Sequence, residues 1–176
     1  RKKNQYIKDK SRYDYWKRTE FTLEQWKIIK KFAEKNKLVF MSSPFSIKAA
    51  KDLNEIKIKA WKIGSGEINN YPMLEYIAKT KKPIFLSTGL SNYKEISDSI
   101  KFLKKYNSKI ILMQCTSLYP CPKNKVGLNV INEFINRFKL KVGYSDHSGK
   151  IEILMAAYSL GAKVLETHVT FSKQIK

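Results

Sequence analysis

The chain has 176 residues, 43% of them hydrophobic, with two cysteines and a formal net charge of +20 at pH 7. This length and composition suit one globular domain and argue against disorder, a disulfide framework and a membrane-spanning helix, which needs roughly 20 apolar residues. The charge comes almost entirely from scattered lysines, with only four arginines among 35 basic residues, which argues against a nucleic-acid partner.

Six short segments predict buried strands, because each is rich in Val, Ile, Leu or Phe and ends in small or polar residues. They are residues 38–43, 59–65, 83–88, 110–117, 141–146 and 163–169. The residues taken as the ends of these six strands, from Ser43 in the first to His168 in the last, follow one another at steps of 21, 23, 28, 30 and 23 residues. Each step is too long for a hairpin and suits a strand, a helix and the next strand.

The intervening segments carry helix signals. Residues 21–37 begin with a capping box formed by Thr22 and Gln25, and apolar residues then recur at helical spacing. Similar signals, including a proline in a first turn and Gly161 as a left-handed cap, extend this prediction to further segments. These predicted helices cover residues 71–80, 91–106, 129–138 and 151–161.

A strict alternation of strands and helices implies a parallel sheet. Two forms compete, an open doubly wound sheet and a closed barrel, and polar residues at the carboxyl end of nearly every strand favour the barrel. We therefore predict a (β/α)8 TIM barrel with about six of its eight βα units present. Residues 1–20 give no convincing strand, so we expect the first two units to be missing.

Several strand ends carry groups that suit an anionic ligand. The segment WKIGSGE places Lys62, Ser65 and Glu67 beside two glycines, and a lysine with hydroxyls and backbone N–H groups is what a phosphate or carboxylate needs. An ordinary glycine loop is the alternative for this motif taken alone. Further hydroxyls follow other strands, in MSSPF, FLSTGLS and QCTSLYPCP, and include Ser43, Ser87, Ser117 and Tyr119.

His147 and His168 are the only histidines, and they follow neighbouring predicted strands. Because the carboxyl ends of neighbouring parallel strands lie close together, the two imidazoles could share one ion, with Asp146 and Glu166 beside them. Such a set suits a divalent Mn²⁺, Fe²⁺, Co²⁺ or Zn²⁺ ion. The residues alone leave a metal site and two ordinary hydrogen-bonded histidines equally open.

Six motifs occur together in one order: FMSSPF, KIGSGE, LSTGLS, QCTSLYP, GYSDHSG and LETHVTFSK. In order and spacing they resemble the sialic acid synthase family, which comprises N-acetylneuraminate synthase and its relatives for other nonulosonic acids. The resemblance runs from about Glu20 to the end of the chain. It implies a (β/α)8 catalytic barrel that condenses phosphoenolpyruvate with an N-acetylated amino sugar, such as N-acetylmannosamine, and releases phosphate.

The resemblance also implies roles for individual residues. The implied sets are the catalytic residues Glu67, Glu166 and Tyr119, the substrate-binding residues Ser43, Lys62, Ser65, Ser87, Ser117 and Ser145, and the metal ligands His147 and His168. Within the substrate-binding set, the phosphate and carboxylate of phosphoenolpyruvate are assigned to Lys62, Ser65, Ser87 and Ser145. Ser117 occupies a position that is often asparagine in the family. The implied cofactor is Mn²⁺ or Mg²⁺.

Two parts of the family pattern have no match here. No segment corresponds to the first two strands, which carry a catalytic glutamate and a further phosphoenolpyruvate-binding lysine. We therefore expect residues 1–176 to be a partial catalytic barrel, strands 3 to 8, without the small C-terminal antifreeze-like domain and with little or no synthase activity alone. The full-length parent is expected to be a cytoplasmic homodimer with no nucleic-acid or membrane partner.

Three alternatives remain. One is another phosphoenolpyruvate-dependent 3-deoxy sugar acid synthase, although a phosphorylated acceptor would call for an arginine-rich pocket and arginine is scarce. A second, from a different class, is a basic nucleic-acid-binding module, which a steep loss of DNA or RNA affinity with salt would support. The third is a degenerate fragment without activity. The acceptor sugar stays open among N-acetylmannosamine, a diacetylated bacillosamine-derived sugar and a pseudaminic-type precursor.

Overall fold

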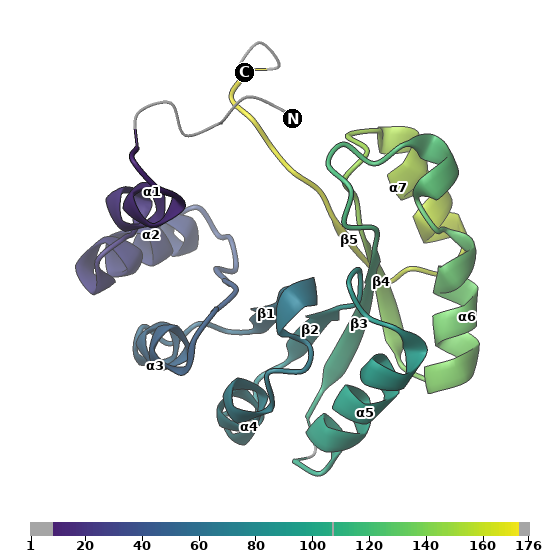
Figure 1. The fold of residues 1–176 in the computed structure, drawn as a ribbon, viewed down its shortest axis with the longest axis horizontal. Coiled ribbons are helices and arrows are strands. Elements are labelled where there is room, and N and C mark those ends of the chain that lie inside the picture. Colours follow the sequence, from purple (N-terminus) through teal and green to yellow (C-terminus); the bar gives the residue numbers. More distant parts are fainter. Residues whose placement is uncertain (1–8, 107, 173–176) are drawn as a thin grey trace. The chain divides into compact units, whose positions relative to one another are not determined.

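The computed structural model describes residues 9–106 and 108–172, which form two compact units divided after Phe40. The first unit contains two helices, α1 (Arg12–Thr19) and α2 (Leu23–Lys35) (Figure 1). The second unit contains all the paired strands of the described chain and five further helices. None of the described helices has the length and apolar character needed to cross a lipid bilayer.

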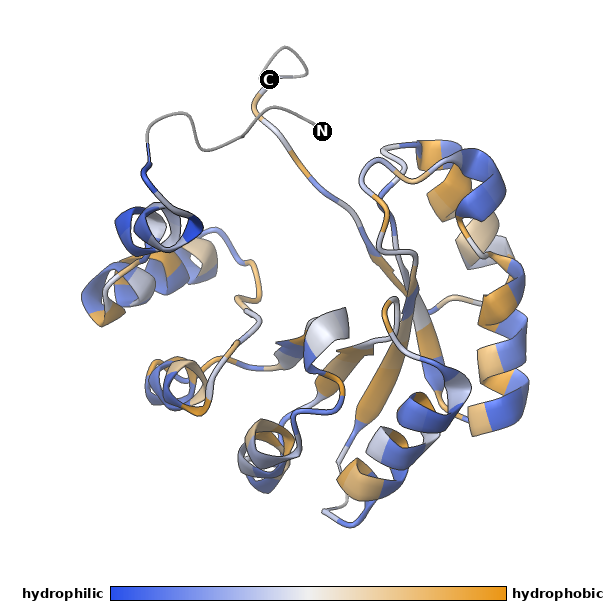
Figure 2. Cartoon of the chain, viewed as in Figure 1, coloured by the Kyte–Doolittle hydropathy of each residue, from blue (hydrophilic) through white to orange (hydrophobic). Residues whose placement is uncertain are grey.

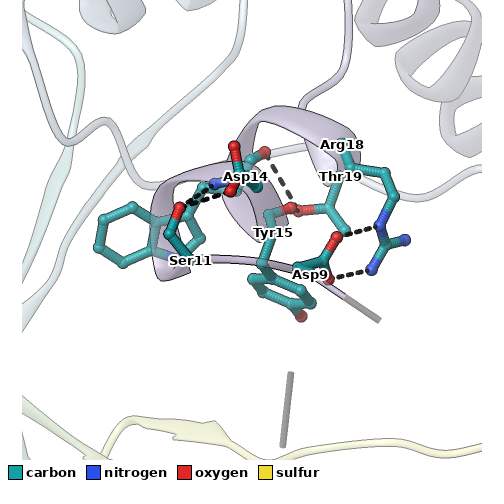
Figure 3. A network of polar contacts seen from close by, with 7 residues as sticks. Asp9, Ser11, Asp14, Tyr15, Arg18 and Thr19 are labelled. Atoms are coloured by element: carbon teal, nitrogen blue, oxygen red, sulfur yellow. Dashed lines mark hydrogen bonds and ion pairs between the residues drawn. The ribbon is translucent and has the colours of Figure 1, made fainter. Parts of the chain in front are cut away.

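Side-chain caps define where the helices of the first unit begin. Ser11 Oγ accepts a hydrogen bond from the first turn of α1, and the Arg18 guanidinium donates two of 2.9 Å to Asp9 (Figure 3). This guanidinium lowers the pKa of the Asp9 carboxyl. α2 begins with the predicted capping box, in which the side chains of Thr22 and Gln25 each accept from the other's backbone amide. The described start of the chain therefore contains a helix and no strand.

The second unit is a parallel α/β structure. Its strands pair in the order β1-β2-β3-β4-β5, so each strand lies beside the next one along the chain. The sheet is curled, and helices α3 to α7 lie along its outer face (Figure 1). The predicted parallel α/β fold is confirmed in this form, a curled half-barrel. Its elements are α3 (Ile47–Glu55), β1 (Trp61–Ile63), α4 (Tyr71–Lys79), β2 (Ile84–Ser87), α5 (Tyr93–Lys104), β3 (Ile110–Cys115), α6 (Asn129–Phe138), β4 (Lys141–Ser145), α7 (Ile151–Ser159) and β5 (Val164–Glu166).

The predicted strand over residues 38–43 is wrong. Only an isolated bridge forms there, between Ser42 and Trp61, supported by a 3.3 Å hydrogen bond from the Lys62 amide to the Ser42 carbonyl. Among the described residues this segment has a pairing partner on one side only, β1, and β1 is itself three residues long. One short neighbour cannot satisfy the backbone groups of a six-residue strand. The helix α3, which sequence periodicity did not single out, follows directly after Ser46 caps its first turn.

The two faces of the sheet carry different side chains. Paired residues of parallel strands share a face, and Trp61, Ile84 and Leu86 lie on the face toward the helices, each fully buried. α4 and α5 cover this face with their own apolar stripes, and Figure 2 shows hydrophobic residues concentrated on the strands and on one side of these helices. The inner face carries a row of residues that pair in register across four strands, from Lys62 on β1 to Lys141 on β4, here called the register row. The inner face is therefore partly polar.

Replacing Lys57 with glycine is expected to stabilise the protein by about 0.5–1 kcal/mol. Lys57 follows α3 with φ at 60°, a left-handed conformation that costs a side chain more than it costs glycine. The gain is smaller than the full strain because glycine also loses more entropy on folding. Urea unfolding measures the change, with Lys59→Gly as a control, since Lys59 is exposed and has no positive φ. Equal effects of the two substitutions would contradict this explanation.

Candidate active site

An ion pair crosses the inside of the curled sheet. Lys62 Nζ, from the middle of β1, lies 3.2 Å from Glu166 Oε2 at the end of β5. From the described residues, no hydrogen bond with good geometry reaches that buried carboxylate oxygen, so the pair is held by charge rather than by a directed bond. Both residues line a cavity of about 530 Å³, the interior cavity, together with Ser43, Phe85 and Met113. Three predicted site residues from distant parts of the sequence therefore meet at one place.

Two buried serines belong to the same inner face. Ser87 pairs in register with Met113, which lines the interior cavity, and Ser145 pairs with Glu166. Ser87 is 2% exposed, and its hydroxyl has no hydrogen-bond partner among the described residues. Burying a hydroxyl without a hydrogen-bond partner costs about 1–3 kcal/mol of folding free energy. A ligand that forms a hydrogen bond with the Ser87 hydroxyl would offset this cost.

Ser65 forms a second group with the loops after β2 and β3. Its Oγ accepts a hydrogen bond of 3.0 Å from the Gly89 amide and lies 3.2 Å from Cys115 Sγ. Gly89 leaves no room for a side chain, because a Cβ there would lie 2.6 Å from Ser117 Oγ and 2.8 Å from Cys115 Sγ. The predicted residues Ser65 and Ser117 are thus packed around one glycine.

The two histidines come together around a tyrosine. The ring centroids of His147 and His168 are 5.4 Å apart, and Tyr119 lies 4.0 Å from the first and 5.9 Å from the second. These rings line a cavity of about 260 Å³, the imidazole cavity, which shares Thr167 with the interior cavity. The predicted convergence of both histidines at neighbouring strand ends is therefore confirmed as a geometric fact.

The backbone fixes the orientation of one imidazole. His147 Nδ1 lies 2.7 Å from the carbonyl oxygen of Thr116. Since a carbonyl can only accept, Nδ1 carries the proton, which leaves the lone pair of Nε2 free to bind a metal ion. Desolvation, together with the charges of Cys115 and Glu166, raises the pKa of Tyr119, so this phenol stays protonated at neutral pH.

The donor set fits a divalent ion held by two imidazoles and otherwise by water or substrate. Within the described residues, no group of three or more His, Cys, Asp or Glu side chains is arranged to hold an ion. Two other candidate ligands have different roles: Glu166 pairs with Lys62, and the Asp146 carboxylate accepts hydrogen bonds from Ser148 and Gly149. A site of this kind keeps several positions open, which suits catalysis better than structural support.

Asp146 lines the imidazole cavity and supports the histidine loop. The residue is 1% exposed, and its carboxylate accepts hydrogen bonds from the Ser148 amide and hydroxyl, at 3.1 and 2.6 Å, and from the Gly149 amide at 2.8 Å. Three donors to one carboxylate form a tight turn directly after His147. The sequence predicted this carboxylate beside the two histidines, where it does line the imidazole cavity, and its oxygen atoms also shape the loop.

Replacing Asp146 with asparagine is expected to lower the free energy of unfolding by about 2 kcal/mol. The amide retains one oxygen but turns an NH₂ group toward backbone donors that need an acceptor. Urea unfolding measures the loss, and Asp98→Asn is the matched control, because Asp98 is partly exposed and pairs with Lys94 within one helix. The role assigned to Asp146 would be wrong if both variants lost the same small amount.

Glu67 stands apart from the other predicted site residues. It lies in a short 3-10 turn, and its carboxylate accepts a 2.8 Å hydrogen bond from the Asn70 side chain. It lines neither the interior cavity nor the imidazole cavity. Cys115, in contrast, reaches the site without having been predicted, and the QCTS segment that contains it offered only its place at a strand end as a signal.

The parallel sheet is curled, and both imidazoles and several polar side chains gather toward the carboxyl ends of its strands. This arrangement is typical of barrel-type α/β proteins, whose sites lie at that end. Residues 1–176 match the NeuB family over the whole chain, and the chain belongs to this family. It is 41% identical to the N,N'-diacetyllegionaminic acid synthase of Campylobacter jejuni over 170 residues, covering 95% of this chain and 51% of that protein.

Two further relatives extend this comparison. The human N-acetylneuraminate-9-phosphate synthase is 36% identical over 158 residues, which cover 89% of this chain and 44% of that protein. The crystal structure of a sialic acid synthetase from Leptospira borgpetersenii, in complex with citrate, superposes with a TM-score of 0.85 at 32% identity, covering 89% of this chain and 55% of that one. The chain thus spans about half the length of the curated relatives it matches.

Proposed function

We propose that the protein carrying this chain is a nonulosonic acid synthase, which condenses phosphoenolpyruvate with an N-acetylated amino sugar and releases phosphate. The observation that supports this most directly is that the two cavities are adjacent, with Thr167 lining both. The interior cavity offers the Lys62 ammonium to an anion, and the imidazole cavity, which shares Thr167 with it, offers two ring nitrogens. An anionic donor and a carbonyl acceptor bound there would lie side by side, as a carbon–carbon condensation requires.

The proposed roles follow from the chemistry of each side chain. The Lys62 ammonium and the hydroxyls of Ser65, Ser87 and Ser145 bind the phosphate and carboxylate of phosphoenolpyruvate and offset their charge. A divalent ion held by His147 and His168 would supply Lewis-acid polarisation of the open-chain sugar's aldehyde. The enol carbon then bonds to the aldehyde carbon, water adds to the carbon that bears the phosphate, and phosphate leaves by C–O cleavage.

Three further predicted residues, Ser43, Tyr119 and Glu166, line the two cavities. Ser43 lines the interior cavity and Tyr119 lines the imidazole cavity, so both can contact the substrates. Glu166 lines the interior cavity beside Lys62, where a carboxylate can exchange a proton with the ligand. Of the two proposed ions, Mn²⁺ fits better than Mg²⁺, because Mg²⁺ prefers oxygen donors and two imidazoles supply nitrogen.

We also infer that the curled sheet is part of a closed (β/α)8 barrel, to which this chain supplies the five strands β1 to β5 and, ahead of them, the segment that bridges β1 at Ser42. The sequential parallel order supports this, because each crossover then turns the same way around the sheet. The 176 residues alone are expected to turn over little substrate. The complete protein's substrates, its homodimeric state and its cytoplasmic location are part of the same proposal.

A phosphate-release assay tests the proposed function. The protein carrying this chain is incubated with phosphoenolpyruvate and, in parallel, N-acetylmannosamine, a diacetylated bacillosamine-derived sugar, a pseudaminic-type precursor and a phosphorylated aldose. We expect release with one of the N-acetylated sugars, dependent on Mn²⁺ and abolished by a chelator. Release with the phosphorylated aldose alone would favour a 3-deoxy sugar acid synthase instead, and no release with any sugar would contradict both.

A further inference from the structure

We infer that Cys115 is a positioning residue for phosphoenolpyruvate, because its thiol holds the Ser65 hydroxyl ready to donate to the anionic end of that ligand. This inference rests on the proposed function, which assigns Ser65 to phosphoenolpyruvate. It concerns a side chain that the proposed set of site residues does not contain.

The Ser65 hydroxyl connects three consecutive strand ends. Ser65 follows β1, Gly89 follows β2, and Cys115 is the last residue of β3. A hydroxyl has one proton and two lone pairs, and the Gly89 amide, which donates at 3.0 Å, occupies one lone pair. Ser65 Oγ and Cys115 Sγ lie 3.2 Å apart and either can donate to the other, so the Ser65 proton is either donated to the weakly accepting sulfur or free for a ligand.

Sulfur is a suitable partner for a hydroxyl that must change partner. A thiol donates and accepts only weakly, whereas a carboxylate or phosphate oxygen is a strong acceptor. The contact with Cys115 therefore holds the Ser65 side chain in one orientation and is given up at little cost when an anion arrives. A hydroxyl in place of the thiol would compete with the ligand for the same proton.

Packing keeps the thiol in this position. Cys115 is 5% exposed, and a Cβ added to Gly89 would lie only 2.8 Å from its Sγ and 3.0 Å from its carbonyl oxygen. The sulfur is therefore confined between the Gly89 backbone and Ser65. Two substitutions should act through different causes: Cys115→Ala removes the contact, and Cys115→Ser makes it too strong.

A double-mutant cycle tests the inference in steady-state kinetics of the protein carrying this chain. We expect both Cys115 variants to raise the KM for phosphoenolpyruvate about fivefold, while kcat and the KM for the sugar change less than twofold. We expect Ser65→Ala to raise the same KM further, and in the Ser65→Ala background the Cys115 substitutions should have no additional effect. This loss of effect is the signature of a residue that acts through Ser65.

Cys121→Ala is the matched control, because Cys121 is also a 5% exposed free cysteine but has no hydrogen bond to Ser65. It should leave the KM for phosphoenolpyruvate unchanged. Equal effects of Cys115→Ala in the wild-type and Ser65→Ala backgrounds would overturn the inference alone. A wild-type protein without phosphoenolpyruvate-dependent phosphate release would overturn the proposed function and the inference with it. Cys115→Ser is close in size to the native residue, so the test survives if the alanine variant fails to fold.

Discussion

Replacing His147 with alanine is expected to lower phosphate release by at least about a hundredfold and to abolish stoichiometric metal binding. Nδ1 of this ring lies 2.7 Å from the Thr116 carbonyl oxygen and donates its proton to it, so Nε2 is the nitrogen offered to the ion. With two imidazoles as the protein donors, removing one leaves a single nitrogen, which cannot retain the ion. Phosphate release and elemental analysis of the purified variant measure the two losses.

His147→Phe separates metal binding from ring packing. Phenylalanine can keep the contact with Tyr119, whose ring centroid lies 4.0 Å from that of His147, but it supplies no nitrogen. We expect this variant to be as inactive as His147→Ala while its thermal stability stays closer to that of the wild type. If His147→Phe retained both activity and bound metal, the ring would have a packing role and the assignment of the ligand would fail.

Replacing Lys62 with methionine is expected to lower kcat/KM for phosphoenolpyruvate about a hundredfold or more. Methionine has a similar length and volume, so the main change is the loss of the ammonium. The anionic ligand then lacks its counter-charge, and the Glu166 carboxylate, 3.2 Å away, loses its cation. Titration with phosphoenolpyruvate by calorimetry should show the loss directly, independent of the chemical step.

Lys141→Met is the matched control for this experiment. Lys141 belongs to the same register row as Lys62 but is exposed at the start of β4, and it does not line the interior cavity. We expect this variant to bind phosphoenolpyruvate like the wild type. Adding Glu166→Gln to Lys62→Met tells the two causes apart, because recovery of affinity would mean that the unpaired carboxylate, rather than the missing ammonium, repels the ligand.

The sequence was sufficient to predict the elements whose signals are local. The capping box at Thr22, the helical spacing of apolar residues and the polar ends of apolar runs all depend on neighbours along the chain, and the corresponding elements are present. The strand over residues 38–43 failed because an apolar run does not reveal whether a partner lies on both of its sides. Even a correct composition for a strand cannot supply the missing hydrogen bonds.

In the site, too, features that follow from spacing along the chain could be predicted, and features that depend on the path of a loop could not. Both histidines were placed at neighbouring strand ends from their spacing alone, and their rings indeed approach each other. The turn formed by Asp146 and the contact between Cys115 and Ser65 could not be predicted, because each depends on the path of a loop. Whether a carboxylate faces an ion or its own backbone is decided by a few loop dihedral angles, which no spacing rule reports.

The pair formed by Lys62 and Glu166 has a consequence for the curvature of the sheet. Apart from the bridge at Ser42, β1 and β5 are the outer strands of the described sheet, and each is only three residues long. Lys62 and Glu166 sit one on each of these strands, and their side chains meet 3.2 Å apart across the inside of the sheet. Attraction between the two charges therefore draws the first and last described strands toward each other, so the groups proposed to handle the substrate also favour the curled form that brings the strand ends together.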